Sequence, residues 1–262
     1  MNTLGILMRG TDRNMNIYTQ LVSGVFFPIH ERLKGHETVR VRREMEKSQW
    51  QEPQQIEELQ IKNLQQFLSS VEQHVSCYSE LFKHLGFSTS NIKSLEDLQQ
   101  LPLTDKSFIR ANLERLKANN GIGLSRFNTG GSSGEPLIFY IGKERVSHDV
   151  AAKWRATRWW GVDIGDPEVV VWGSPIELGT QDRARQLRDG ILRTRLLPAF
   201  EMSKEKIDSF IRTIRSVRPK MLFGYPSALA HIASHAEQRG ICMDDLGIKV
   251  AFVTSERLYD HQ

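Results

Sequence analysis

A cluster of glycine and hydroxyl residues near the middle of the chain carries the clearest chemical signal. Glycine admits backbone torsions that other residues avoid, so successive N–H groups in such a segment can turn toward one centre. Together with side-chain hydroxyl groups, these donors suit a loop that wraps a polyphosphate. On composition alone, a hairpin turn between two strands is an equally good interpretation. The cluster consists of Thr129, Gly130, Gly131, Ser132, Ser133 and Gly134, followed by Glu135 and Pro136.

Two histidines four residues apart, His231 and His235, have a spacing that can bind zinc on a helix. The zinc-peptidase pattern needs a glutamate directly after the first histidine to act as general base, and Ile232 stands there. We therefore interpret both histidines as ordinary helix residues, and the sequence predicts no metal site.

Composition places the chain among ordinary globular proteins. Its 262 residues are 39% hydrophobic and 25% charged, which excludes disorder along the whole chain and collagen-like or low-complexity architectures. The two cysteines, Cys77 and Cys242, exclude a disulfide framework and a four-cysteine zinc site, and they favour a reduced, cytoplasmic setting. An apolar stretch at 21–29 is too short to span a bilayer. A net charge of +4 does not by itself indicate nucleic-acid binding, and we expect no such partner.

The elements that must position the loop change character along the chain. Residues 1–50 are polar and basic, and we interpret them as an extended arm with one short helix. Apolar residues at helical spacing then predict a helix over 54–75, and two shorter helices follow. The sequence thus predicts a mainly helical N-terminal region, 1–120, and an α/β part, 121–262.

The second half of the chain alternates apolar runs with helical periodicity. This alternation predicts a mostly parallel sheet covered by helices. The expected strands lie near 168–172, 194–197, 220–225 and 249–254. The expected helices lie near 144–160, 203–217 and 227–239, and two short strands at 124–127 and 137–141 flank the glycine-rich loop.

The loop and four further segments resemble one enzyme family. The run Thr-Gly-Gly-Ser-Ser-Gly-Glu-Pro is similar to the phosphate-binding loop of adenylate-forming, AMP-binding enzymes. The other segments match, in the same order, motifs of the phenylacetate–CoA ligase group, and the third is most similar to the branch linked to capsular polysaccharide biosynthesis. They are 101–106 (LPLTDK), 161–166 (GVDIGD), 218–227 (RPKMLFGYPS) and 253–258 (VTSERL).

This resemblance implies a role for each matching residue. The loop from Thr129 to Gly134 would hold the β- and γ-phosphates of ATP. Ser255, Glu256 and Arg257 would place their backbone near the adenine, although a surface loop leaving a core strand is the alternative interpretation. Tyr225, Pro226 and Ser227 would wall the acyl pocket, or the Tyr-Pro pair would only separate a strand from a helix.

The resemblance also implies a reaction and its cofactors. Acid and ATP would give an acyl-adenylate and pyrophosphate, and coenzyme A or another acceptor would then take the acyl group. The family's aromatic-Gly-x-x-Glu motif, which helps to place Mg²⁺, has no counterpart in these 262 residues, and neither does the lysine-bearing C-terminal domain. Glu135 also stands where many members have lysine.

Two functions therefore remain open on the sequence. The chain is either the N-terminal part of an AMP-forming ligase, inactive alone and needing a complementing C-terminal segment, or a non-catalytic nucleotide-binding or remnant protein of the same fold.

Overall fold

The computed structural model describes residues 16–129, 136–173 and 183–262. Two compact units make up the chain: residues 1–34 with 153–262 form one, and residues 35–152 form the other. The chain passes from the second unit back into the first within helix α8 (Lys143–Arg158). The division at residue 120 that the sequence suggested stays a prediction.

The unit of residues 35–152 is mainly helical, as predicted. Helix α5 begins with a capping box in which Glu52 and Gln55 satisfy each other's backbone N–H groups. Helix α6 ends at Gly86, whose φ of 62° is the left-handed conformation that glycine adopts at low cost. A core of Leu68, Phe82, Phe87 and Ile92 holds these helices together. The helices are α4 (Thr38–Ser48), α5 (Pro53–His74), α6 (Ser76–Leu85) and α7 (Lys106–Ala111), with 3₁₀ turns at Thr89–Asn91 and Glu96–Gln100.

Two strands that flank the glycine-rich segment in the sequence pair with each other in this unit. Strands β1 (Ser125–Asn128) and β2 (Ile138–Ile141) pair antiparallel, with Ser125 opposite Ile141 and Asn128 opposite Ile138. The two short strands expected on either side of the loop are therefore confirmed.

The first 50 residues differ from the expectation. Residues 16–50 are largely helical, so the predicted extended arm is wrong for this segment. In α4, Arg40 pairs with Glu37 and Glu44, and Arg42 pairs with Glu46, at the three- and four-residue spacings that support a helix. These pairs also balance the charges of Arg40 and Arg42. The segment before α4 comprises α2 (Ile17–Leu21), a π-helical turn (Val22–Phe26) and α3 (Phe27–Leu33).

A parallel sheet forms the centre of the other unit. Its order is β4-β3-β5-β6, and every neighbouring pair is parallel. Each connection is a helix, as continuous apolar strands between amphipathic segments predict. The strands are β3 (Glu168–Trp172), β4 (Thr194–Pro198), β5 (Met221–Gly224) and β6 (Val250–Val253), and the connecting helices are α10 (Arg183–Leu192), α11 (Lys204–Val217) and α12 (Pro226–Gln238).

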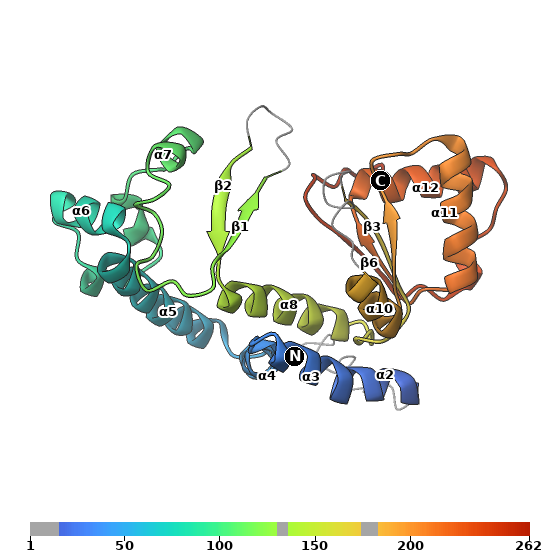
Figure 1. The fold of residues 1–262 in the computed structure, drawn as a ribbon, viewed down its shortest axis with the longest axis horizontal. Coiled ribbons are helices and arrows are strands. Elements are labelled where there is room, and N and C mark those ends of the chain that lie inside the picture. The colour runs from blue at the N-terminus through green and yellow to red at the C-terminus, as the bar shows by residue number, and fades with distance from the viewer. Residues whose placement is uncertain (1–15, 130–135, 174–182) are drawn as a thin grey trace. The chain divides into compact units, whose positions relative to one another are not determined.

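Helices α11 and α12 pack on one face of this sheet (Figure 1). Val169 and Val171 of β3 are fully buried beneath Ile207 and Ile211 of α11 and Ile232 of α12. The predicted fold class is confirmed: a helical N-terminal region is followed by a parallel sheet covered by helices. Because all four strands run the same way, their carboxyl ends lie at one edge, where ligands of open α/β sheets bind.

Candidate functional site

A cavity of about 350 Å³ opens at the carboxyl edge of the sheet. Every strand of the sheet contributes to its lining through the residues that follow it, and α12 supplies the rest. The lining residues are Gly173 after β3, Ala199, Phe200 and Met202 after β4, Tyr225 after β5, Glu256 after β6, and Ser227, Ala228 and His231 of α12.

Aromatic stacking fixes the position of Tyr225. Its ring lies 4.3 Å from the ring of Trp172 at an interplanar angle of 18°, and Trp172 also contacts Phe223 at 5.8 Å. The ammonium group of Lys153 lies 4.4 Å above the Phe223 ring. Such contacts add to the energy of burial and restrict ring motion. Tyr225 therefore forms a rigid wall of the cavity.

A left-handed residue turns the chain after β6. Ser255 has a φ of 69°, a conformation that costs a residue other than glycine ~1 kcal/mol. The preceding residue, Thr254, still donates its N–H to the Gly224 carbonyl at 3.2 Å. The turn brings the Glu256 carboxylate to the start of α12, where Oε2 accepts the backbone N–H of Ser227 at 3.2 Å. An anion at a helix N-terminus interacts favourably with the helix dipole.

Glu256 supplies a cap that α12 itself does not provide. Tyr225 at the N-cap position makes no side-chain capping bond, and Pro226 at the first helical position has no N–H. Ser227 therefore carries the first free backbone donor of the helix, and the carboxylate from the β6 loop meets it. Of the predicted site residues, Tyr225, Ser227 and Glu256 thus line one cavity. Pro226 is buried at the start of the helix.

Two of the residues predicted to contact adenine, Ser255 and Arg257, do not line this cavity. The Arg257 guanidinium lies 5.1 Å over the ring of Tyr259. Their assigned role was a backbone contact, which side-chain direction does not decide, so that role stays a prediction.

Thr129 closes the base of the glycine-rich loop. Its N–H donates to the Leu137 carbonyl at 3.0 Å, and its Oγ1 accepts the Leu137 N–H at 3.0 Å. The hydroxyl oxygen of Thr129 therefore accepts a hydrogen bond at the base of the loop, and its contact with a phosphate stays a prediction. The other residues of the predicted phosphate loop, Gly130 to Gly134, lie outside the described residues.

The sequence prediction missed His231 as a site residue. It lies four residues after Ser227, on the same face of α12, and lines the cavity. That spacing was the one signal available in the sequence. His235, one turn further on, is buried, and its Nε2 lies 2.9 Å from Asp208 Oδ1, a contact that joins α12 to α11.

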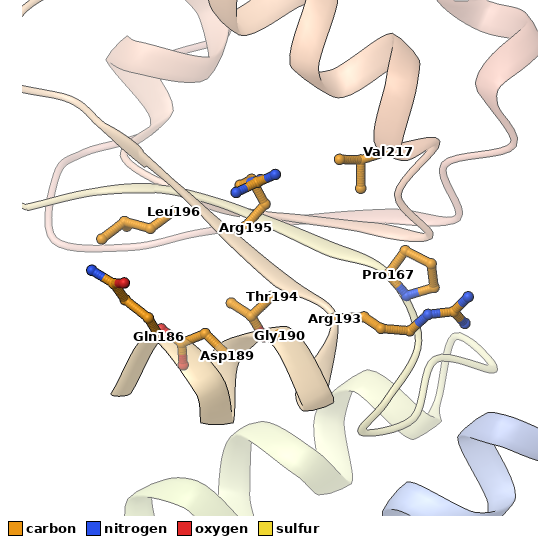
Figure 2. Close-up of a pocket in the computed structure, with 9 residues that line it drawn as sticks. All are labelled: Pro167, Gln186, Asp189, Gly190, Arg193, Thr194, Arg195, Leu196 and Val217. Atoms are coloured by element: carbon orange, nitrogen blue, oxygen red, sulfur yellow. The ribbon is translucent and has the colours of Figure 1, made fainter. Parts of the chain in front are cut away.

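A second cavity, of about 550 Å³, lies at the opposite edge of the sheet. Figure 2 shows residues of α10, among them Gln186 and Asp189, beside β4 residues such as Thr194. The Asp189 carboxylate accepts a 2.6 Å hydrogen bond from the neighbouring Arg188, so its charge is balanced. None of the described residues that the sequence predicted for the site lies here.

The described residues contain no group of three histidine, cysteine or acidic side chains that could hold a metal ion. Glu256 is one carboxylate already bound to a backbone N–H, so this cavity does not offer the donor set that Mg²⁺ prefers.

Within the described parts of the chain, the helices are all too short or too polar to cross a membrane.

No protein-family model matches the chain. Protein CapK of Staphylococcus aureus is 26% identical over 204 residues, which are 78% of this chain and 45% of CapK. A 2-hydroxyisobutyryl-CoA ligase solved with 2-HIB-AMP and CoA superposes with a TM-score of 0.54 at 22% identity, covering 78% of this chain and 44% of the ligase. The same ligase in its postadenylation state with R3-HIB-AMP superposes with a TM-score of 0.53 at 21% identity, covering 77% of this chain and 43% of the ligase.

The chain has an adenylate-forming ligase fold. The superposition includes 77% of its residues. The chain spans less than half the length of CapK and of the ligase. At these identities the superposition establishes the fold, and the activity is argued below.

Proposed function

We propose that this chain is the N-terminal part of an ATP-dependent, AMP-forming acid ligase of the phenylacetate–CoA ligase-like group. The observation that carries the proposal is the cavity at the carboxyl edge of the sheet, where Tyr225, Ser227 and Glu256 meet. Three residues chosen from two separate sequence motifs line this one cavity. The similarity to CapK supports the capsular polysaccharide branch, which remains the finer part of the proposal.

In this proposal the cavity receives the acyl part of the substrate. The Tyr225 ring, fixed by Trp172, and Phe200 supply apolar surface, while Glu256 and His231 supply polar groups. The backbone of 255–257 contacts the adenine, and Thr129 to Gly134 hold the phosphates of ATP. The carboxylate of the acid attacks ATP, pyrophosphate leaves, and coenzyme A or another acceptor then takes the acyl group.

The proposal also defines what this chain does not supply. Mg²⁺ assists this reaction in the family, but the described residues offer no ligand set for it, so we assign it no residue here. A complementing C-terminal segment would bring the remaining groups. We expect the 262 residues by themselves to bind an acyl-adenylate mimic without forming one from acid and ATP. A cytoplasmic location stays a prediction of the sequence.

Calorimetric titration with a butanoyl sulfamoyl adenosine, a stable mimic of an acyl-adenylate, tests this proposal. We expect saturable binding at one site. The Phe200 side chain is 50% exposed in the cavity wall, so Phe200→Ala loses about half of the ~3 kcal/mol of a buried aromatic group, or about tenfold in affinity.

Phe67→Ala is the matched control because Phe67 is 64% exposed on α5 and lies outside the cavity. Wild-type protein that shows no saturable binding, or equal losses in the two variants, would contradict the proposed site.

A further inference from the structure

Two polar side chains in the lining of the carboxyl-edge cavity, Glu256 and His231, indicate a substrate class. We infer that Glu256 and His231 select acids whose acyl chain carries a hydrogen-bond donor, an amino or hydroxyl group, over acids with a saturated end or a second carboxylate. This inference rests on the proposed function, because it assumes that the cavity receives the acyl group.

Among the described residues, apolar side chains make up most of the cavity lining. Ala199, Phe200, Met202, Ala228 and the Tyr225 ring provide carbon surface. The remaining side chains come from α12 and from the β6 loop. A volume of about 350 Å³ accommodates a short chain or one ring, so a substituent on the acyl group lies within reach of the polar side chains in the lining.

Glu256 presents a carboxylate that forms no ion pair with a cation among the described residues. Its one hydrogen bond to those residues is the 3.2 Å contact of Oε2 with the Ser227 N–H. The nearby Arg257 lies over the Tyr259 ring instead. A carboxylate has two oxygens with about four acceptor positions, so Glu256 retains acceptor capacity.

The backbone holds Glu256 at this place. Ser255 adopts its left-handed conformation directly after β6, and Thr254 is bonded to Gly224 of the neighbouring strand. The carboxylate is therefore attached at two points, through the β6 turn and through the N-terminus of α12. Glu256 is exposed, but the turn and this hydrogen bond restrict it, and a restricted group discriminates between ligands better than a mobile one.

His231 adds a second polar group to the cavity lining. It stands one turn after Ser227 on α12 and lines the cavity with Glu256. A neutral imidazole carries one acceptor nitrogen, so a donor on the substrate can meet an acceptor from each of two elements. A second substrate carboxylate would instead meet the negative charge of Glu256, and a methyl group would satisfy neither residue.

Titration of the full 262-residue chain with three matched sulfamoyl adenosines tests this inference. β-Alanyl and butanoyl chains have nearly the same shape and differ in an ammonium against a methyl group, while a succinyl chain ends in a carboxylate. Two unit charges ~4 Å apart in water interact by ~1 kcal/mol, which is about fivefold in affinity. We expect the β-alanyl ligand to bind about fivefold tighter than butanoyl, and the succinyl ligand about fivefold weaker.

Glu256→Gln keeps an oxygen for the Ser227 N–H but removes the charge, and it should bring the three affinities within about twofold of one another. Glu237→Gln, an exposed position later on α12, is the control and should retain the full order. His231→Leu should weaken the β-alanyl ligand and leave butanoyl binding unchanged.

The outcomes separate this inference from the function on which it rests. Equal binding of the three ligands by the wild-type chain, or an order that survives Glu256→Gln, would overturn the inference and leave the ligase proposal standing. Failure of all three ligands to bind would overturn both.

Discussion

Gly224, the last residue of β5, should not tolerate a side chain. A Cβ built at this position lies 2.4 Å from the backbone oxygen of Val171 and 3.1 Å from the Val171 Cβ. Contacts under 3.0 Å are essentially never seen for a real Cβ, and the nearer atom belongs to the backbone of the central strand β3, which cannot rotate away. Gly224→Ala must therefore separate β3 from β5 by several tenths of an ångström. Overpacking of this kind costs ~1–3 kcal/mol.

Urea unfolding followed by circular dichroism measures this cost. We expect Gly224→Ala to lower the unfolding free energy by about 2 kcal/mol with an unchanged urea dependence. Gly190→Ala is the control: it lies in helix α10, a Cβ there meets nothing within 4 Å, and alanine should stabilise the helix by ~0.5–1 kcal/mol. If Gly224→Ala changes stability by less than ~0.5 kcal/mol, the close approach of the two strands is wrong.

Three further predictions follow from the structure. The Asp166 side chain is 1% exposed and accepts hydrogen bonds from Lys220 Nζ and Thr19 Oγ1, each at 2.8 Å. Asp166→Asn should therefore lower the unfolding free energy by ~2–4 kcal/mol in a thermal or urea melt, while Asp245→Asn, where the aspartate side chain of the ion pair is 58% exposed, should lower it by under ~1 kcal/mol. Similar losses of unfolding free energy in the two variants would refute the buried pair. The hydrogen bond from His235 holds the pKa of Asp208 below its ordinary 3.8. The stabilisation lost in Asp208→Asn should therefore be present at pH 7 and decrease as the pH falls through the lowered pKa, and a loss that instead grows as the pH falls would contradict this. The purified chain should show no acid-dependent exchange of labelled pyrophosphate into ATP with aryl, fatty or amino acids, and clear exchange would show that these residues contain the catalytic groups we did not find.

The sheet could be predicted because its strands are continuous apolar runs. The expected strand at 168–172 is observed as Glu168–Trp172, and the helix expected at 203–217 as Lys204–Val217. A residue buried on both sides has to be apolar whatever its tertiary neighbours are, so local pattern alone identifies such elements. Residues 16–50 lack this property because ion pairs and tertiary packing form their helices. Thr19, for example, is fully buried against Asp166, 147 positions later in the chain.

The same distinction applies to the tryptophans at the end of α8. The helix expected near 144–160 would contain all three. Trp154 lies within α8 and packs in the core, edge-on against Phe27, but Trp159 and Trp160 follow the end of the helix and are 41% and 53% exposed. The expected helix therefore extended two residues too far.

The candidate site was predictable where it depends on strand ends. Tyr225 and Glu256 follow two adjacent parallel strands, so the rule that carboxyl ends share one edge brings them together. His231 could not be assigned in this way. Its place in the cavity depends on how α12 packs over that edge, and no local pattern encodes this arrangement.

Hydrogen–deuterium exchange with and without a saturating acyl sulfamoyl adenosine tests the central claim most directly. The cavity at the carboxyl edge predicts slower exchange in peptides that cover 225–231 and 254–257. Peptides that cover 186–196, beside the second cavity, should exchange at an unchanged rate. Protection confined to 186–196, or no protection at a ligand concentration that saturates binding, would contradict the claim that this chain holds an acyl-adenylate at the carboxyl ends of its strands.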